Sequence, residues 1–352
     1  MKRGHKSSSS FSDQKKFNED ETNDESSEDR EREHLREQYS LMIDQLFYKR
    51  FSLKHHKATT IKKYDDVKLE LLKLEERLNH VKSQIPTSHL KEWRLHTKRT
   101  HPMRPLVQQL IHNYGLQCCS QAFCKFYEIL KRYPDLCELK SDPHENNELR
   151  SLHLCEAPGA FISALNVYLR LKKPDLKWSW RANTLNPHYE WTRTSDMFVD
   201  DELLTSTHSN WLFGEDNSGD IMQWDREYLN TLLENNEHYF NLITADGSLY
   251  CQNDPSNQEC LTYPLLKKQV EISLFLLETG GSLVIKIYTM LREETSSLIA
   301  RLLRSFDEVD LFKPSSSKPS NSEVYLICRG YKRDVMSTDI VMWTVIFYIS
   351  SR

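Results

Sequence analysis

The chain has 352 residues, of which 38% are hydrophobic and 28% are charged. This composition supplies enough apolar material for a folded core, while the high charge indicates that part of the chain is solvated. The net charge of −4 excludes a surface coated in basic residues. A local basic groove remains compatible with it, because many acidic residues fall within the first 35 positions.

The N-terminal segment, residues 1–33, is of low complexity and nearly devoid of large apolar side chains. We predict that it is disordered, since it cannot bury enough surface to offset the entropy of ordering. It has no apolar core of the kind found in secretory signals. The apolar run Ile340–Ile349 is about half as long as the ~20 residues of a membrane span, so we interpret it as a strand or a packed terminal segment.

Eight cysteines are present, and none of them forms a CxxC pair or a Cys/His cluster with zinc-finger spacing. The pattern therefore predicts no metal site. It favours reduced thiols, as in a protein of the nucleus or the cytoplasm.

Residues 34–85 show a helical spacing of apolar side chains, and Pro86 ends the run. Residues 91–104 hold seven basic or histidine side chains together with Trp93, a composition that suits RNA phosphates and bases but equally a solvated loop. A second helix is predicted over 106–130. It contains Lys125 beside an apolar face, where a lysine is usually only snorkelling to solvent.

From residue 151 onward, strands alternate with helices. We predict strands at 151–155, 177–185, 241–248, 280–289, 309–312 and 323–329, with helices at 162–171, 264–279 and 292–304. This alternation indicates an α/β fold, with a mostly parallel sheet flanked by helices.

The segment His153–Phe161, HLCEAPGAF, reads as a strand, a tight Pro-Gly turn and a helix start. Gly159 has no Cβ, so a ligand can approach the backbone closely. The N-terminus of the following helix is expected to offer free N–H groups. The segment lacks the GxGxxG pattern and the Walker lysine, which disfavours a dinucleotide or ATP. A plain strand–turn–helix junction is the alternative.

Three further side chains stand out near strand ends. Asp246 ends an apolar strand, Lys286 lies within one, and Glu323 opens the last strand. Taken singly, Asp246 and Glu323 fit ordinary turn or strand-edge acids. A lysine in an apolar strand needs a partner carboxylate, and a lowered pKa would suit a general base.

These segments, in this order, resemble the FtsJ/RrmJ-type ribose 2′-O-methyltransferases with their Lys-Asp-Lys-Glu tetrad. The matching motifs are CxxPGxF at Cys155–Phe161, Asp246, GGxxVxK at Gly280–Lys286 and SExY at Ser322–Tyr325. The sequence over about residues 95–333 most resembles a eukaryotic branch of this family that modifies mRNA caps. The chain departs from many members of the family in having His153 where they carry an acid, and Glu156 is expected to take over a polar role.

The resemblance implies a Rossmann-like class I methyltransferase with a helical N-terminal extension and S-adenosyl-L-methionine as cofactor. It implies a catalytic tetrad of Lys125, Asp246, Lys286 and Glu323. The expected cofactor-binding residues are Glu156, Pro158, Gly159, Ala160, Phe161, Trp178, Asn186, Asp220 and Asp246. Candidates for RNA contacts are Lys91, Arg94, Lys98, Arg99 and Arg104.

In the implied mechanism, Lys286 is the general base for the ribose 2′-hydroxyl. Lys125 adds a second positive charge that lowers the pKa of Lys286 and favours the developing alkoxide. Asp246 orients Lys286, and Glu323 orients Lys125 or the hydroxyl. No metal is required.

The implied substrate is the 5′ end of capped mRNA, methylated on the second transcribed nucleotide (cap1 to cap2), in the nucleus and cytoplasm and without a membrane. An rRNA or tRNA 2′-O-methyltransferase and a catalytically inactive RNA-binding scaffold are the alternatives. The predicted organisation is a disordered tail (1–33), a helical extension with a basic linker (34–104), the methyltransferase domain (105–333) and an atypical C-terminal segment (334–352).

Overall fold

The computed structural model describes residues 49–53, 64–84, 87–101, 103–139, 148–190, 201–236, 239–249, 251, 257–318 and 321–333. Of the two units into which the chain divides, Met1–Lys49 and Arg50–Arg352, the second holds every described residue except Lys49. The predicted disordered tail and the apolar run Ile340–Ile349 lie outside the described residues. The predicted domain boundaries stay predictions.

The described strands form one eight-stranded sheet with the order β1-β7-β8-β6-β5-β2-β3-β4. Their bounds are β1 Lys49–Leu53, β2 Glu148–Leu154, β3 Lys177–Asn183, β4 Trp211–Leu212, β5 Phe240–Ala245, β6 Leu277–Ile287, β7 Phe306–Lys313 and β8 Val324–Tyr331. The predicted α/β fold with a mostly parallel sheet is confirmed, and the six predicted strands correspond to β2, β3, β5, β6, β7 and β8.

Strand order reverses between β2 and β5, and this reversal creates the edge at which ligands bind in such sheets. From β2 the chain proceeds to β3 and β4 on one side, then returns to β5 and β6 on the other. These five strands pair in parallel. The carboxyl ends of β2 and β5 are therefore neighbours, with Leu154 paired to Ala245.

β8 runs antiparallel between β6 and β7, and this reversal brings its first residues to the carboxyl end of β6. Lys286 pairs directly with Tyr325. Because side chains alternate along a strand, Lys286, Tyr325 and Glu323 lie on the same face of the sheet. The adjacent pair, Ile285 and Leu326, points to the opposite face, into the main hydrophobic core.

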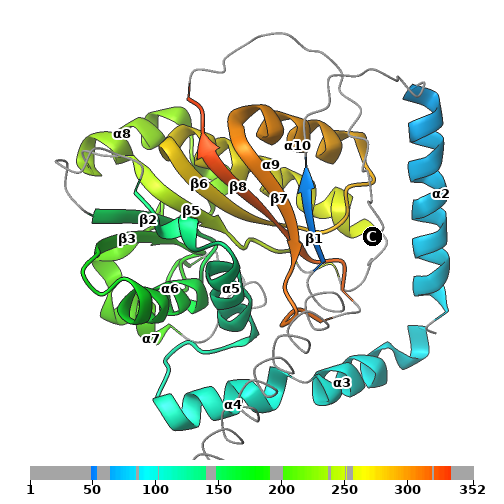
Figure 1. Ribbon diagram of the computed structural model, residues 1–352, viewed down its shortest axis with the longest axis horizontal. Helices are drawn as coiled ribbons and strands as arrows, with labels where there is room; N and C mark the ends of the chain where they lie inside the picture. Colours follow the sequence, from blue (N-terminus) through cyan, green and yellow to red (C-terminus); the bar gives the residue numbers. More distant parts are fainter. Residues whose placement is uncertain are drawn as a thin grey trace, which may run out of the picture. The chain divides into compact units, whose positions relative to one another are not determined.

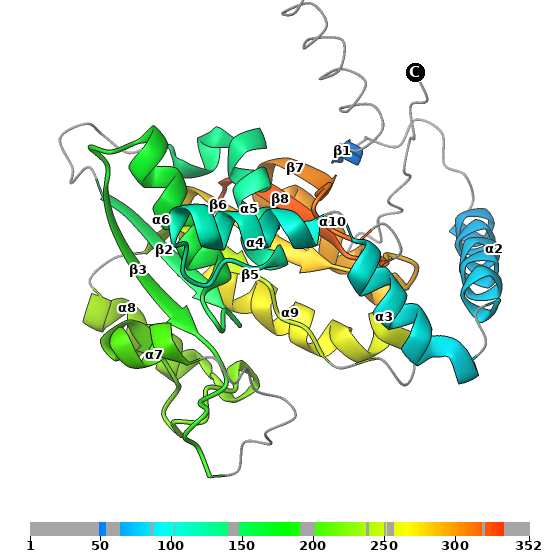
Figure 2. The ribbon, with the colours of Figure 1, turned by 90° about the horizontal axis from the view of Figure 1, so that it is seen from below.

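Helices cover both faces of the sheet (Figures 1 and 2). The α-helices are α2 Tyr64–Ser83, α3 Leu90–Thr100, α4 Met103–Tyr114, α5 Gln121–Arg132, α6 Ala160–Lys172, α7 Glu202–Ser206, α8 Arg226–Asn236, α9 Gln258–Leu276 and α10 Glu293–Ser305. α5 and α6 lie on one face, and α9 lies on the other, as Figure 2 shows. None of the described helices combines the length and the apolar character that a membrane span requires.

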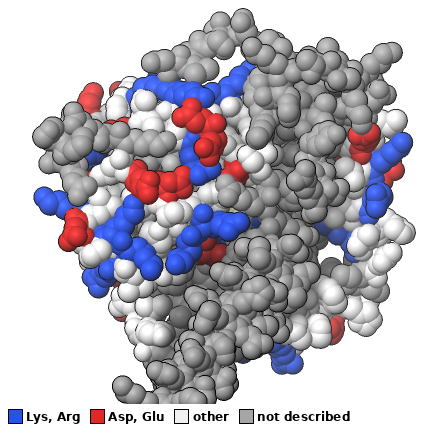
Figure 3. Space-filling view, viewed as in Figure 1, with Lys and Arg blue, Asp and Glu red and all other residues white. Residues whose placement is uncertain are grey.

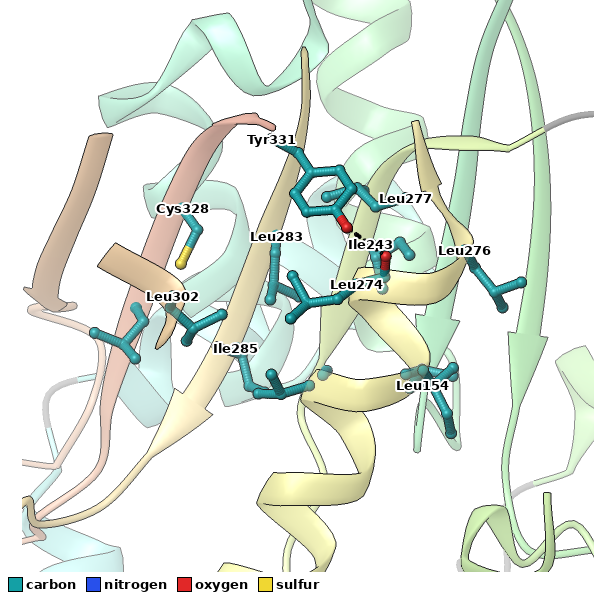
Figure 4. Close-up of a cluster of buried hydrophobic side chains, with 14 of the residues drawn as sticks. Leu154, Ile243, Leu274, Leu276, Leu277, Leu283, Ile285, Leu302, Cys328 and Tyr331 are labelled. Carbon is teal, nitrogen blue, oxygen red and sulfur yellow. Dashed lines mark hydrogen bonds between the residues drawn. The ribbon is translucent and has the colours of Figure 1, made fainter. Parts of the chain in front are cut away.

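The main core fills the space between the sheet and the helices α9 and α10 (Figure 4). Leu283 and Ile285 of β6 contribute to it, as does Leu302 of α10. Tyr331, the last residue of β8, closes this core by donating a hydrogen bond from its hydroxyl to the carbonyl of Leu274, 2.7 Å away.

The N-terminal part of the described chain differs from the sequence prediction in one respect. α2 confirms helical structure within 34–85, but residues 49–53 form the edge strand β1 instead of helix. Pairing at a sheet edge outweighs the weak helical preference of this short segment. α2 contacts the rest of the unit through Glu75, which accepts a hydrogen bond from Arg292 at 2.7 Å.

The basic stretch 91–104 is mostly helical, forming α3, so its interpretation as a loop was wrong. The helix predicted over 106–130 is two helices, α4 and α5. Gly115 interrupts them with a positive φ of 59°. Ser120 then starts α5 as its N-cap, because its hydroxyl accepts a hydrogen bond from the amide of Ala122.

Candidate active site

The structure brings the four predicted tetrad residues together as two buried ion pairs. Nζ of Lys125, from α5, lies 2.5 Å from Oε1 of Glu323. Nζ of Lys286, from β6, lies 3.1 Å from Oδ1 of Asp246, which follows β5. Glu323 also acts electrostatically on Lys286, so the two pairs are coupled neighbours. An arrangement of two lysines and two carboxylates balances its own charge, as burial requires.

Lys125 reaches this site because α5 packs over the face of the sheet that carries Lys286. The aromatic rings of Phe126 and Phe161 stack with centroids 4.4 Å apart, and Phe161 also contacts Tyr325 of β8. Phe126 is fully buried. This apolar contact holds α5 against the sheet. Lys125 is therefore buried, with only 8% of its area exposed.

The pKa of Lys286 corrects one prediction. Burial by itself lowers this pKa, but the opposing effects of Asp246, Tyr288 and Glu323 are larger and raise it above its usual value. The expected lowered pKa is therefore wrong for the site as it stands, because nearby carboxylates stabilise the ammonium form. The lysine also donates a hydrogen bond to the backbone carbonyl of Asp246 at 2.7 Å.

Glu323 is held as a carboxylate. Its burial raises its pKa, but Lys125, Lys286 and the hydroxyl of Ser317 together lower it below the usual value. The Ser317 hydroxyl donates its hydrogen bond to Oε1 at 2.8 Å. Glu323 therefore faces Lys125, one of the two orientations expected for it.

Tyr325 is a site residue whose role the sequence analysis missed. Its hydroxyl donates a hydrogen bond to Oδ1 of Asp246 at 2.9 Å, and its side chain is fully buried. The only sequence signal was its place in the SExY motif, two residues after Glu323, which puts both side chains on one face of the sheet. Asp246 is thus oriented from two sides, by Lys286 and by Tyr325.

The turn that follows β2 supports the site from the other side of the strand-order reversal. Glu156 is 4% exposed, and its Oε1 accepts hydrogen bonds from the amides of Phe161 and Ile162 at 2.7 and 3.2 Å. The expected free N–H groups of α6 are therefore already taken at these two positions. Burial raises the pKa of Glu156 to about 8, although the two amides oppose this.

Gly159 has a positive φ of 112°, a conformation that glycine adopts readily. A Cβ here would lie 2.2 Å from Cδ2 of Leu203 in α7. The glycine therefore permits a close approach of the Leu203 side chain, and the predicted approach of a ligand stays a prediction. Ala160 and Phe161 are buried in the first turn of α6.

A small pocket lies beside the Pro-Gly turn and past the end of β3. It is lined by Ala157, Pro158, Thr184, Leu185, Pro187, Asp201, Leu204 and Trp211. Asn186 lies between Leu185 and Pro187, and its Nδ2 donates a hydrogen bond to the carbonyl of Asn217, so it holds the neighbouring loop.

Acidic groups gather around the thiol of Cys155, which is the first residue after β2. Burial raises the pKa of this thiol to about 12; Lys286 opposes the rise, whereas Asp246, Asp220 and Glu156 reinforce it. Three carboxylates from three separate segments thus act at one point. Asp220 also accepts a hydrogen bond from the amide of Met222 as the N-cap of a short 3₁₀ helix, Ile221–Gln223.

Trp178 does not join this group. It is the second residue of β3 and pairs with Leu149, at the start of the parallel strands. At about 3.3 Å per residue, it lies roughly 16 Å along the strand from Asn183, which ends β3 at the edge of the site. Its indole donates a hydrogen bond to the hydroxyl of Ser151 and supports the sheet. Because β3 begins at Lys177, Trp178 lies at the start of the strand, away from the edge where the other predicted cofactor-binding residues follow their strands.

His153, the residue that replaces an acid in the motif, has a structural place. It is fully buried and bridges the hydroxyls of Ser151 and Thr244 with contacts of 3.0 and 2.8 Å. Burial lowers its pKa to about 3, so it is neutral. Glu156, three residues later, is an acid of the turn itself, where it accepts hydrogen bonds from the first turn of α6.

The candidate RNA-contacting residues lie on two helices. Lys91, Lys98 and Arg99 recur at helical spacing on α3 and are exposed, as is Arg104 on α4, and Arg94 belongs to α3 as well. Among the described residues, none of these four exposed cations forms an ion pair. They do not reach the tetrad, but α3 ends beside it.

His101, which follows α3, makes the connection to the tetrad region. It is buried, with Nε2 at 3.3 Å from Nε2 of Gln121 in α5. Gln121 donates a hydrogen bond to the carbonyl of Ser316. Burial lowers the pKa of His101, and Lys318 and Lys125 lower it further. The C-terminal end of α3 is therefore close to Lys125.

Within the described residues, no group of three or more histidine, cysteine, aspartate or glutamate side chains could hold a metal ion. All eight cysteines are free.

The amino-acid sequence matches known proteins. A model of the FtsJ-like methyltransferase family matches residues 118–331. The chain is 40% identical over 264 residues to the cap-specific mRNA (nucleoside-2′-O-)-methyltransferase 2 of Mus musculus, covering 74% of this chain and 34% of that protein. The Drosophila melanogaster protein of the same name is 39% identical over 267 residues, covering 74% and 37%.

A probable methyltransferase of African swine fever virus is 28% identical over 241 residues, covering 65% of this chain and 53% of that protein. The chain thus spans only about a third of the length of the mouse and fly relatives. The family model covers more than half of the chain and includes all four tetrad positions. The chain therefore belongs to the FtsJ-like methyltransferase family, with S-adenosylmethionine as the methyl donor.

Proposed function

We propose that the chain methylates the ribose 2′-hydroxyl of the second transcribed nucleotide of capped mRNA. The type of reaction is supported by two neighbouring ion pairs, Lys125–Glu323 and Lys286–Asp246, near the point where the strand order reverses. The choice of a cap is supported by the names of the mouse and fly relatives. We expect the protein to act where capped mRNA occurs, in the nucleus and the cytoplasm.

The residues present fit the cofactor. The acidic groups of Glu156, Asp220 and Asp246 act on one point, and a cationic ligand group beside them would favour the ionised form of Glu156. Ala157 and Pro158, which directly follow Glu156, line a small and mostly apolar pocket at this end of the sheet. S-adenosylmethionine supplies, when bound, an electrophilic methyl group on a positively charged sulfur.

Lys286 is the residue that handles the proton of the ribose hydroxyl. Two contacts of its Nζ go to Asp246, one to the backbone carbonyl and one to the carboxylate. An ammonium group has three N–H donors, so a third remains for the 2′-oxygen. The neutral amine takes the hydroxyl proton onto Nζ as the nucleophile forms. The raised pKa makes this neutral form a minor one at neutral pH.

Lys125 stabilises the charge that develops on the 2′-oxygen. It is buried and fixed by Glu323, so its ammonium group costs little reorganisation during the reaction. Tyr325 and Lys286 together fix Asp246, which keeps Nζ of Lys286 aimed at the substrate. Orientation of this kind is a large part of what such a site contributes.

RNA binding rests on a local surface and not on the overall charge. On the face shown in Figure 3, basic and acidic side chains of the described residues are interspersed. The exposed cations Lys91, Lys98 and Arg99 share one side of α3. His101, which directly follows this helix, lies close enough to Lys125 to feel its charge. We assign this side of α3 to the phosphates of the RNA 5′ region.

The deciding experiment is methyl transfer from labelled cofactor to short RNAs that differ only at the 5′ end. A cap1 RNA, a capped RNA without 2′-O-methylation and a 5′-triphosphate RNA are compared, and the methylated nucleotide is located by mass spectrometry. Labelling of the second nucleotide in capped RNAs alone is expected. Equal labelling of the triphosphate RNA would contradict the cap assignment. Absence of any transfer, with RNA still bound, would indicate a scaffold.

A further inference from the structure

A stripe of polar side chains on α5 faces the segment that joins β7 to β8. Gln121, Lys125 and Glu128 recur at spacings of four and three residues, which places them on one side of the helix. Gln121 donates a hydrogen bond to the carbonyl of Ser316 at 2.7 Å, and Lys125 pairs with Glu323. The third member of the stripe, Glu128, has no part in the reaction described above.

Both carboxylate oxygens of Glu128 bind this segment. Oε1 accepts hydrogen bonds from the amide and the hydroxyl of Ser315, at 2.7 and 2.9 Å. Oε2 accepts the corresponding two bonds from Ser316, at 3.1 and 2.8 Å. A carboxylate can accept all four because it spreads a full negative charge over two oxygens, whereas a neutral amide has a single acceptor oxygen. The contact therefore depends on the charge of Glu128.

The serines that Glu128 binds belong to a tight turn, residues 314–317, which also carries a partner of Glu323. The amide of Ser317 donates a hydrogen bond to the carbonyl of Pro314 at 3.0 Å and closes the turn. The hydroxyl of Ser317 donates to Oε1 of Glu323, the oxygen that faces Lys125. Ser317 is buried, so this part of the turn is packed against the protein.

The Lys125–Glu323 pair keeps its geometry only if α5 and the turn stay in register. Lys125 lies one helical turn before Glu128, and Glu323 is bound by the last residue of the turn. Without the Glu128 carboxylate, the two amides that it accepts would lose their partner, and the turn would have to shift to reach water. Such a shift would move Ser317 and, with it, Glu323.

We propose that Glu128 is a positioning residue for methyl transfer, whose charge holds the turn 314–317 on α5 and thereby fixes Lys125 and Glu323 relative to each other. Glu128 acts through these two residues and does not touch the reacting atoms. This inference rests on the proposed function, because it takes Lys125 as the group that stabilises the charge developing on the 2′-oxygen.

The variant that isolates this role is Glu128→Gln, which keeps the size of the side chain but removes the charge and one acceptor oxygen. Asp135→Asn is the matched control. Asp135 lies just past α5 and accepts a hydrogen bond from Arg329 of β8 at 2.6 Å, so it joins similar parts of the fold. Arg329 pairs with Ser282, four residues before Lys286 on β6 and thus roughly 13 Å along the strand from the tetrad.

Methyl transfer to RNA by the full chain is measured first. Glu128→Gln is expected to lower kcat by ~10- to 100-fold, since catalysis is sensitive to misplacements of about 1 Å. KM for the cofactor should stay unchanged. In a Lys125→Met background, the same substitution should lower kcat far less, because the residue that Glu128 positions is gone. Asp135→Asn should lower the unfolding temperature and keep the wild-type kcat.

Labelling of lysines with acetic anhydride gives a second readout, which needs no catalysis and is located by peptide mass spectrometry. Lys125, with 8% of its area exposed, is expected to be labelled severalfold faster in Glu128→Gln than in the wild type. Lys286 is similarly buried but lies on β6, so its labelling should not change. Ser315→Ala combined with Ser316→Ala keeps both amides and should give a smaller rise at Lys125.

Three results would overturn the assignment. A wild-type kcat in Glu128→Gln would show that the rate does not depend on this carboxylate. An equal loss of kcat in the Lys125→Met background, or in Asp135→Asn, would mean that Glu128 acts only through the general stability of the fold. Labelling of Lys125 at the wild-type rate in Glu128→Gln would show that the pair is held without it. If labelling of Lys125 rose while the wild-type chain methylated no RNA, the proposed function alone would fail.

Discussion

The hydroxyl of Tyr325 donates a hydrogen bond to the carboxylate of Asp246, on the same oxygen that faces Lys286. This bond joins β8 to the end of β5 across β6. Its removal by Tyr325→Phe is expected to lower kcat by about 10- to 100-fold, since hydrogen bonds to charged groups contribute ~1.5–3 kcal/mol. Packing on Phe161 is retained, so KM for the cofactor should change little.

The control for this prediction is Tyr331→Phe, on the same strand. Tyr331 also loses a buried hydrogen bond, to the carbonyl of Leu274, but lies in the main core. We expect a lower unfolding temperature with unchanged kcat. A similar drop in kcat for both variants would remove the reason to single out Tyr325.

The rate of methyl transfer should rise with pH. Asp246, Tyr288 and Glu323 outweigh burial and raise the pKa of Lys286 above its usual value of 10.5, so the reactive neutral amine is scarce at pH 7. Log kcat is expected to increase with a slope near one from about pH 7 to 9.5, without levelling off. Single-turnover rates over this range test it, and a plateau near pH 7 would contradict Lys286 as the base.

The Lys125–Glu323 pair should behave as a unit in stability measurements. Breaking a buried pair by Lys125→Met or Glu323→Gln is expected to reduce the free energy of unfolding by about 3–5 kcal/mol each. The double variant should lose clearly less than the sum, because neither charge is then left alone. Urea unfolding of all four proteins measures this coupling, and strict additivity would argue against a stabilising pair.

His153 should make the fold sensitive to acid. Burial lowers its pKa from 6.5 to about 3, so the unfolded chain binds a proton that the folded chain excludes. The contribution of His153 is fully present above pH 6.5 and is lost as the pH falls toward 3, amounting to a few kcal/mol. His153→Gln is therefore expected to flatten the fall in urea midpoint between pH 7 and pH 4. An unaltered slope would place the acid sensitivity elsewhere.

Charge reversal on α3 should weaken RNA binding without affecting the cofactor. Lys98→Glu combined with Arg99→Glu is expected to raise KM for RNA severalfold at low salt, with the difference shrinking as salt increases. The same change at Arg170, exposed in the last turn of α6, is the control. Equal effects of the two would mean that α3 has no special place in binding.

The sequence was sufficient for the parts of the site that depend on the order of the elements. Asp246 and Glu156 follow strands whose carboxyl ends meet, and Lys286 stands out because a charged side chain in an apolar strand needs a partner. The family resemblance implied Lys125 and Glu323, which would each pass for an ordinary surface residue. The structure shows both buried against each other.

What could not be predicted depends on exact positions and on the sum of charges. Trp178 was misplaced because its strand begins at Lys177, which puts it at the wrong end of the sheet. The pKa of Lys286 depends on Asp246 and Glu323 from distant segments and on nearby Tyr288, and residue types alone do not determine the sum of their effects. Tyr325 acquires its role from its register opposite Lys286, which no local pattern specifies.

The contact between Gln121 and Ser316 joins residues 195 positions apart, beside the Lys125–Glu323 pair. Contacts of such high separation form late, since a long loop must close before they add stability. β8 is inserted between two strands that precede it in the chain, so Glu323 and Tyr325 complete the site only when this last strand docks. Recovery of catalysis after dilution from denaturant would therefore report the final step of refolding, later than the return of helical signal.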